Sequence, residues 1–171
     1  MAEPFTIYKL TILYMLDKSG FPLTNTQISN FFLEKEYTDY FSIQEVIGEL
    51  TDSELIKAES THSNTQYTLT AAGKNTLVYF KNKISEGIEA DVKNFFDKNK
   101  LKYKQENYVL ADYYKTTSQQ FEVRCQLKTD GYTIIDLKLT VNTQKQAEAI
   151  CNNWKNQNED VYMYLMDTLL K

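Results

Sequence analysis

In the first 80 residues, helix starts and turn residues follow one another in an order that strongly restricts the possible folds. Pro4 suits the first turn of a helix, which is expected over residues 5–17, before a Ser-Gly-Phe-Pro run ends it. This helix is apolar nearly all round, which predicts burial on more than one side. Thr24 and Gln27 have the spacing of a capping box, so a second helix is expected over residues 25–36.

A third helix and a hairpin are expected next. Ser42 and Glu45 repeat the capping-box spacing. The helix behind them carries an apolar stripe at i, i+3, i+4 and i+7, formed by Ile43, Val46, Ile47 and Leu50. Two short extended runs, 55–60 and 65–69, follow and are joined by a polar tip. Thr70 then precedes a further helix.

Three helices closed by a two-stranded wing predict a winged helix-turn-helix domain over residues 1–84. In this motif the second helix of the helix-turn-helix enters the major groove of DNA, and here that recognition helix would be residues 42–52. The alternative is a generic small α+β domain that contains a hairpin. Helix lengths, caps and hairpin agree better with the winged helix.

The second half, residues 85–171, predicts an antiparallel sheet covered by helices, so the chain as a whole is α+β. A helix is expected over 86–98, separated from the preceding one by a break near residues 83–85. Polar and apolar residues then alternate, imperfectly in the first case, in three expected strands: 103–114, 120–128 and 132–140. Asp130-Gly131 is a strong two-residue hairpin signal between the last two strands.

Two helices are expected to follow the sheet. Thr143 and Gln146 form another capping box, and the helix behind them has one apolar face, formed by Ala147, Ile150, Cys151 and Trp154. Asn158 is expected to cap a last helix over residues 159–170. This half is interpreted as a dimerisation or sensing domain. Its tyrosine-rich strands could line a ligand pocket or a partner surface, although tyrosine is also simply a good strand former.

Two helices carry more apolar residues than one face can hold. They are the first helix, between Phe5 and Leu16, and the last, between Val161 and Leu170. Both could form the seam of a homodimer. Alternatively, the last helix is simply buried in the core of the C-terminal half, whereas the first is expected to face both its own domain and something else.

No residue or motif in the sequence indicates a catalytic centre. The single histidine, His62, lies at the expected wing tip without acidic or cysteine neighbours at ligand spacing. No phosphate loop, nucleophile elbow or paired-cysteine motif is present, so we expect no enzyme activity, no metal and no cofactor. Cys125 and Cys151 lie far apart in sequence with no CxxC motif, so we expect both to be small buried apolar residues of a cytoplasmic protein. No apolar stretch approaches the roughly 20 residues of a membrane span, and the N-terminus lacks a signal-peptide pattern.

Charge is the main difficulty for DNA binding. Residues 1–80 contain five lysines, no arginine and ten acidic residues, a net charge of −5. Phosphate neutralisation by Lys and Arg supplies much of the affinity of DNA-binding proteins. The candidate recognition helix has no basic residue and carries Glu45, Glu49 and Asp52.

Neutral hydrogen-bonding side chains could still contact DNA. Glutamine can read adenine, and serine can bind phosphate. The candidate DNA-binding residues on the recognition helix and the wing are Ser42, Gln44, Gly48, Thr51, Thr61, His62, Asn64 and Thr65.

Two stretches resemble known regulators. Pro22-Leu23-Thr24-Asn25-Thr26-Gln27-Ile28 and Gln66-Tyr67-Thr68-Leu69-Thr70-Ala71-Ala72-Gly73 resemble the helix 2 entry and the wing-to-helix exit of bacterial PadR-like and MarR-like proteins. Over its whole length the chain resembles a bacterial family catalogued as a domain of unknown function, DUF4364. That resemblance implies a winged-helix N-terminus, a family-specific C-terminal domain and a role in transcriptional regulation.

Three functions are therefore open. The leading one is a dimeric DNA-binding transcriptional regulator. The second is a winged-helix protein-interaction module that does not bind DNA, and the third is a ligand sensor with a pocket between the C-terminal sheet and its helices.

Overall fold

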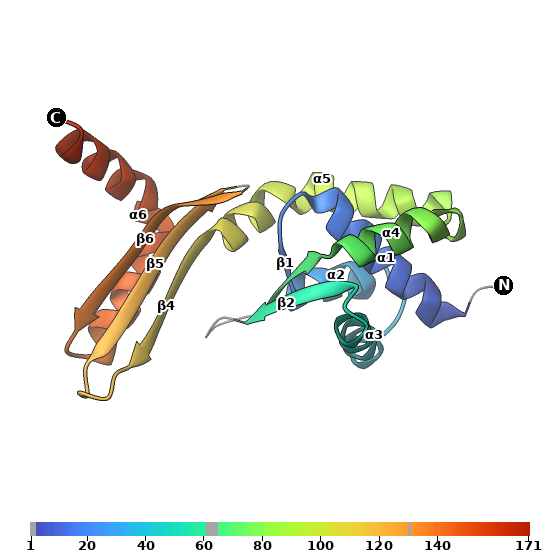
Figure 1. Ribbon diagram of the computed structural model, residues 1–171, viewed down its shortest axis with the longest axis horizontal. Helices are drawn as coiled ribbons and strands as arrows, with labels where there is room; N and C mark the ends of the chain where they lie inside the picture. The colour runs from blue at the N-terminus through green and yellow to red at the C-terminus, as the bar shows by residue number, and fades with distance from the viewer. Residues whose placement is uncertain (1–2, 61–64, 130) are drawn as a thin grey trace. The chain divides into compact units, whose positions relative to one another are not determined.

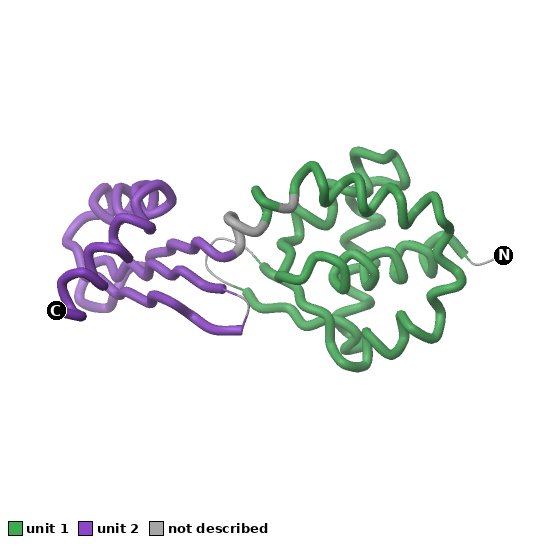
Figure 2. Tube along the Cα trace, turned by 90° about the horizontal axis from the view of Figure 1, so that it is seen from above, with its two compact units in different colours: residues 1–104 green, residues 105–171 purple. Residues whose placement is uncertain are grey.

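The chain divides into two units near residue 104, in a computed structural model that describes residues 3–60, 65–129 and 131–171. Residues 1–104 form the first unit and residues 105–171 the second (Figure 2). The sequence suggested a division after residue 84. The structure instead groups residues 85–104 with the first unit, because this segment adds Val92, Phe95 and Phe96 to the buried residues of that unit.

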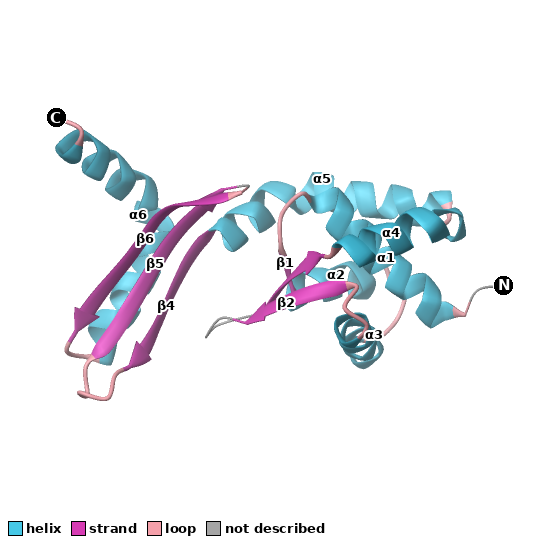
Figure 3. Cartoon of the chain, in the orientation of Figure 1, coloured by secondary structure: helices cyan, strands magenta, loops and turns pink. Residues whose placement is uncertain are grey.

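The first unit is mainly helical, with one small sheet (Figures 1 and 3). Its elements in chain order are α1 (Pro4–Ser19), β1 (Leu23–Thr24), α2 (Asn25–Glu34), α3 (Tyr40–Asp52), β2 (Ile56–Ser60), β3 (Thr65–Leu69), α4 (Ala71–Phe80), the 3-10 turn η1 (Lys81–Lys83) and most of α5 (Glu86–Tyr108), whose last four residues belong to the second unit. The sheet is antiparallel with strand order β1-β3-β2. The predicted order of helices and hairpin is confirmed, and the expected tip at residues 61–64 lies outside the described residues.

Capping motifs in the sequence predicted several helix starts correctly. The Thr24 hydroxyl accepts a hydrogen bond from the Gln27 N–H at 3.2 Å, and the Gln27 side chain accepts one from the Thr24 N–H at 2.9 Å. The expected capping box at Thr143 is confirmed in the same way. The predicted cap at Ser42 is wrong. Asp39 caps α3 instead by accepting from the Ser42 N–H at 2.8 Å, so the helix begins two residues earlier than expected.

The segment after residue 98 is helical where a strand was expected. Helix α5 continues to Tyr108, and the strand that follows is shorter than predicted. The reason is the position of Tyr103, which lies on the same helical face as Val92 and Phe95 and is buried. Its ring lies 5.7 Å from that of Phe95, and no Gly or Pro interrupts the intervening residues.

The second unit is a three-stranded antiparallel sheet with one helix over it (Figure 1). Its elements are β4 (Val109–Lys115), β5 (Phe121–Thr129), β6 (Tyr132–Val141) and α6 (Gln144–Leu169), and the strand order is β4-β5-β6. The expected pair of C-terminal helices is therefore wrong. Asn158 lies inside α6, where its amide donates to the Trp154 and Lys155 carbonyls at 3.0 Å, rather than capping a new helix.

The core of the second unit follows the predicted alternation. Val123, Cys125 and Ile135 face α6, which contributes Ala147 and Trp154 to the same cluster. The β5–β6 hairpin pairs Thr129 with Tyr132. Of the predicted Asp-Gly turn, Gly131 adopts φ +100°, and Asp130 lies outside the described residues.

Helix α1 is enclosed by its own unit. Its residues from Leu10 to Leu16 are all buried, and it contacts α3, α4, β3 and η1. Contacts within its own unit thus account for the burial of the central residues of this helix.

The start of α4 is clamped to the turn after α3. The Thr70 hydroxyl donates toward the Glu54 and Leu55 carbonyls at 2.8 and 2.9 Å, and the Thr70 N–H donates to the Leu55 carbonyl at 3.2 Å. One helical turn later Gly73 passes so close to Leu55 that an added Cβ would lie 2.0 Å from its carbonyl oxygen. A glycine is therefore required at this position.

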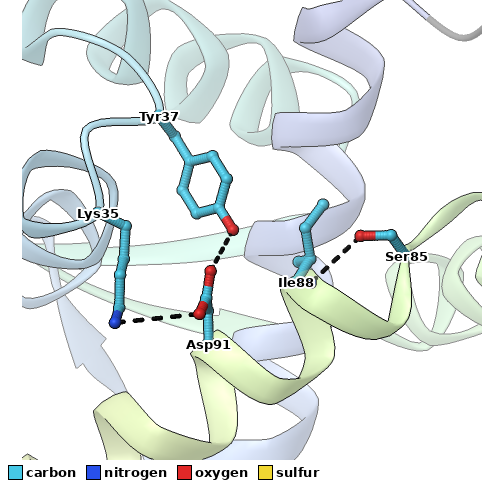
Figure 4. Close-up of polar contacts among 5 residues, drawn as sticks. All are labelled: Lys35, Tyr37, Ser85, Ile88 and Asp91. Atoms are coloured by element: carbon cyan, nitrogen blue, oxygen red, sulfur yellow. Dashed lines mark hydrogen bonds and ion pairs between the residues drawn. The ribbon is translucent and has the colours of Figure 1, made fainter.

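Helix α5 is attached to the α2–α3 connection by polar contacts (Figure 4). The Tyr37 hydroxyl donates to the Asp91 carboxylate at 2.5 Å, and the Lys35 ammonium lies 3.9 Å from the same carboxylate. Burial, and then the hydrogen bond to Asp91, raise the pKa of Tyr37 to about 12. At the start of α5, the Ser85 hydroxyl accepts the Ile88 N–H at 3.2 Å.

Glycine positions 73 and 48 should respond in opposite ways to alanine. Gly73→Ala should lower the free energy of unfolding by about 3 kcal/mol, because its Cβ would collide with backbone. Gly48→Ala should raise it by about 0.5–1 kcal/mol, because this α3 glycine has open space around it and alanine favours the helix. Urea unfolding followed by far-UV circular dichroism measures both. Equal effects at the two sites would contradict the clamp.

Tyr37→Phe should reduce the loss of stability at high pH. The unfolded tyrosine ionises near pH 10, whereas the folded one keeps its proton to about pH 12, so the wild type loses stability as pH rises through this window. The variant lacks this titration, although at pH 7 it loses about 1 kcal/mol with the hydrogen bond. Urea unfolding at both ends of the window tests this, with the exposed Tyr79→Phe as control. A slope equal to that of the wild type would disprove it.

Candidate binding surface on helix α3

Helix α3 presents opposite faces to the core and to solvent. Its predicted stripe is confirmed: Ile43, Val46, Ile47 and Leu50 are all buried. The helix contacts α1, α2 and β2. The side of α3 that faces solvent is therefore fixed by packing, and the candidate residues can be placed relative to it.

Gln44 does not face solvent freely, because its amide is bound to α2. The Asn25 amide donates to the Gln44 carbonyl oxygen at 2.6 Å, and the Gln44 amide donates back to Asn25 at 2.7 Å. The Gln44 amide also lies 3.1 Å from the hydroxyl of the buried Ser29. We call these three residues the α2–α3 clasp. Both polar atoms of Gln44 are engaged in it, so reading a base would require the clasp to open.

The other candidate residues differ in their exposure and in their hydrogen bonds. The Thr51 hydroxyl donates to the Ile47 carbonyl at 2.8 Å within the helix, and Ser42 is half-buried in the first turn. Gly48 is exposed with open space around it. The Thr65 hydroxyl lies 3.1 Å from that of Ser60 on the neighbouring strand.

Gln44, Gly48 and Thr51 thus lie along one side of α3 at i, i+4 and i+7, whereas Ser42 lies in the first turn on another side. The remaining candidates, Thr61, His62 and Asn64, lie outside the described residues.

The solvent-facing side of α3 combines an aromatic ring with carboxylates. Phe41, Glu45, Gly48 and Asp52 follow one another at i, i+4, i+7 and i+11, and we call them the α3 outer stripe. All four are exposed, and Phe41 is 83% exposed. The ring of Tyr40 lies 6.1 Å from that of Phe41, edge to face. Phe41 is not among the residues predicted from the sequence, although a phenylalanine opposite the buried stripe of a helix is itself a signal of contact with a partner.

Lysines do little to offset the acidic character of this surface. Of the five lysines in residues 1–80, four lie within 4.0 Å of a carboxylate: Lys9 with Glu49, Lys35 with Asp91, Lys57 with Glu59, and Lys74 with Asp17. The fifth, Lys18, lies over the ring of Tyr14 at 5.6 Å. In the described part of the chain, Glu45 and Asp52 of the outer stripe form no ion pair.

The described residues offer neither a metal site nor a membrane span. Within them, no three His, Cys, Asp or Glu side chains are arranged to hold a metal ion. None of their helices combines the length and apolar character needed to cross a membrane.

The second unit leaves part of its C-terminal helix uncovered. Val161, Tyr162 and Leu165 of α6 contact the sheet cluster, whereas Met163, Tyr164 and Leu169 are exposed. Of the two helices expected to form a dimer seam, only α6 therefore retains exposed large apolar residues along its length, and α1 has its central residues buried in its own unit.

Comparison with known proteins identifies a family without an assigned activity. No curated protein and no solved structure matches the chain. A family model described as a domain of unknown function, DUF4364, matches residues 8–169. The match covers nearly the whole sequence, and the chain therefore belongs to the DUF4364 family.

Proposed function

We propose that the first unit is a winged-helix domain that binds a protein partner through the α3 outer stripe. The fold assignment is supported by the order α1-β1-α2-α3-β2-β3 and the sheet order β1-β3-β2. In a winged helix, the helix at the position of α3 makes the principal contact with the target. The kind of target that is bound depends on the side chains that this helix exposes.

The observation that carries the proposal is Phe41, which is 83% exposed in a stripe that also holds two carboxylates without ion-pair partners among the described residues. Exposed aromatic rings are the usual anchors of protein interfaces. Glu45 and Asp52 repel phosphate but attract a basic protein surface. We therefore propose a partner that has an apolar pocket for Phe41 with lysine or arginine side chains around it.

Double-stranded DNA is the second candidate, supported by the arrangement of elements. Ser42 and Gly48 lie on α3 where a recognition helix would approach the major groove. DNA binding would make the chain a transcriptional regulator. It would have to overcome two exposed carboxylates on this helix, and the lysines nearest in sequence, Lys35 and Lys57, already lie beside carboxylates.

Charge reversal distinguishes the two candidates because it acts on them in opposite directions. In the double variant Glu45→Lys/Asp52→Lys, the outer stripe becomes basic, so binding to a labelled duplex should appear and should weaken with salt. Fluorescence anisotropy at about 50 mM salt and above measures this. We expect no salt-dependent binding by the wild type. Wild-type binding that Gly48→Asp abolishes would contradict the protein-partner proposal and favour DNA.

A photoreactive phenylalanine analogue at position 41 should capture the partner in the source cells. The expected product is a protein adduct that is lost in the Glu45→Lys/Asp52→Lys background, because the basic partner surface is then repelled. The matched control carries the analogue at Tyr79 of α4, which is 78% exposed and should give no such adduct. Adducts that form equally at both positions, or that persist after charge reversal, would refute the proposal.

A further inference from the structure

Strand β6 is a long, open sheet edge. It spans Tyr132–Val141 and pairs with β5 on one side, while no described strand pairs with its other side. Such an edge exposes a row of backbone donors and acceptors that can pair with another strand. Near its start Leu127 pairs with Ile135 and Lys128 with Thr133, so Ile134 forms a bulge. Regular edge backbone therefore begins at Ile135.

Helix α6 does not cover the whole face of the sheet at this edge. Helix α6 packs mainly against β4 and β5. Leu139 lies directly opposite the fully buried Val123 and so points to the same face, yet it remains 45% exposed. The edge strand thus leaves apolar surface that α6 does not cover.

The opposite face of β6 carries a like-charge pair across strands. Arg124 of β5 forms a bidentate pair with Asp136, with distances of 2.9 and 2.7 Å. Lys138 lies directly across from Arg124, a like-charge pair that is unfavourable in a sheet. Lys138 has no ion pair within the described part of the chain. A carboxylate on the outer side of β6 would relieve this repulsion.

We propose that β6 pairs antiparallel with β6 of a second copy of this chain, about a two-fold axis through Leu137. This register places Asp136 opposite Lys138 of the partner subunit, and by symmetry it does so twice. On the covered face it places Ile135 opposite Leu139 of the partner subunit. One sheet then continues through both copies, and Asp136 of the partner subunit gives Lys138 a carboxylate directly opposite.

Other pairings do not give this complementarity. Antiparallel neighbours share a face, so the next allowed registers shift by two residues. One of them places Asp136 opposite its own copy, and another places Lys138 opposite its own copy. The free edge of β4 brings no opposite charges together in any such register, because Asp112 then faces itself, an apolar residue or a tyrosine. Charge therefore selects β6 and this register.

Single charge reversals should dissociate the dimer without unfolding its subunits. In Lys138→Glu, the new carboxylate faces Arg124 within the subunit but opposes Asp136 of the partner subunit. We expect the dissociation constant to rise about tenfold or more, measured by sedimentation with the full chain. Lys115→Glu makes the same charge change on the β4 edge and should leave it unchanged. Circular dichroism checks that each variant is folded.

Mixing two repelling variants provides the decisive measurement. Asp136→Lys chains and Lys138→Glu chains should each be monomeric, yet together they should form a heterodimer, because every pair in the register is then opposite in charge. The single-chain swap Asp136→Lys/Lys138→Asp should restore the homodimer and keep a carboxylate across from Arg124. A monomeric wild type at about 100 μM, or a Lys138→Glu dimer as tight as the wild type, would overturn the proposal. So would a mixture that does not associate.

Discussion

The paired amides of Asn25 and Gln44 determine which part of α3 can reach a partner. Each side chain satisfies the other, and the buried hydroxyl of Ser29 completes the network, so breaking it would leave polar groups without partners. The clasp and the buried apolar stripe together fix the rotation of α3. The outer stripe is the side of α3 that these contacts leave exposed. Which residues a partner can reach therefore depends on the packing of the whole unit and not on the helix sequence alone.

The order of elements in the first unit suggests DNA binding, whereas its charge distribution disfavours it. The five lysines of residues 1–80 lie beside carboxylates or an aromatic ring, so little positive potential is left in that segment to gather phosphate. Exposed ion pairs contribute little to stability, so this arrangement matters mainly for recognition. In the proposed function, the aromatic anchor and the uncompensated carboxylates would attract a basic partner and repel nucleic acid. The second unit, in contrast, carries complementary charges along one edge strand.

Local signals predicted most elements, whereas tertiary contacts decided where they end. Thr24 and Thr143 cap as expected because a capping box closes within four residues. The extension of α5 depends on Tyr103 packing against Phe95, and the continuity of α6 on a buried Asn158, neither of which local sequence reveals. The candidate site was predictable only in its location. Gln44 was a predicted contact residue, but Asn25 and Ser29 of α2 bind its amide. Phe41 was not predicted, yet it is exposed. No local pattern reveals the contact between α2 and α3 that makes this difference.

The position of Trp154 gives the second unit an optical signal of its own. It is the single tryptophan of the sequence, it is buried against the sheet, and its indole N–H donates to the Gln126 carbonyl at 3.1 Å. Indole emission therefore reports on residues 105–171 alone, whereas the helical far-UV signal comes from both units. Coincident transitions in the two signals would mean that the units unfold as one cooperative system, and separate transitions that each is an independent folding domain.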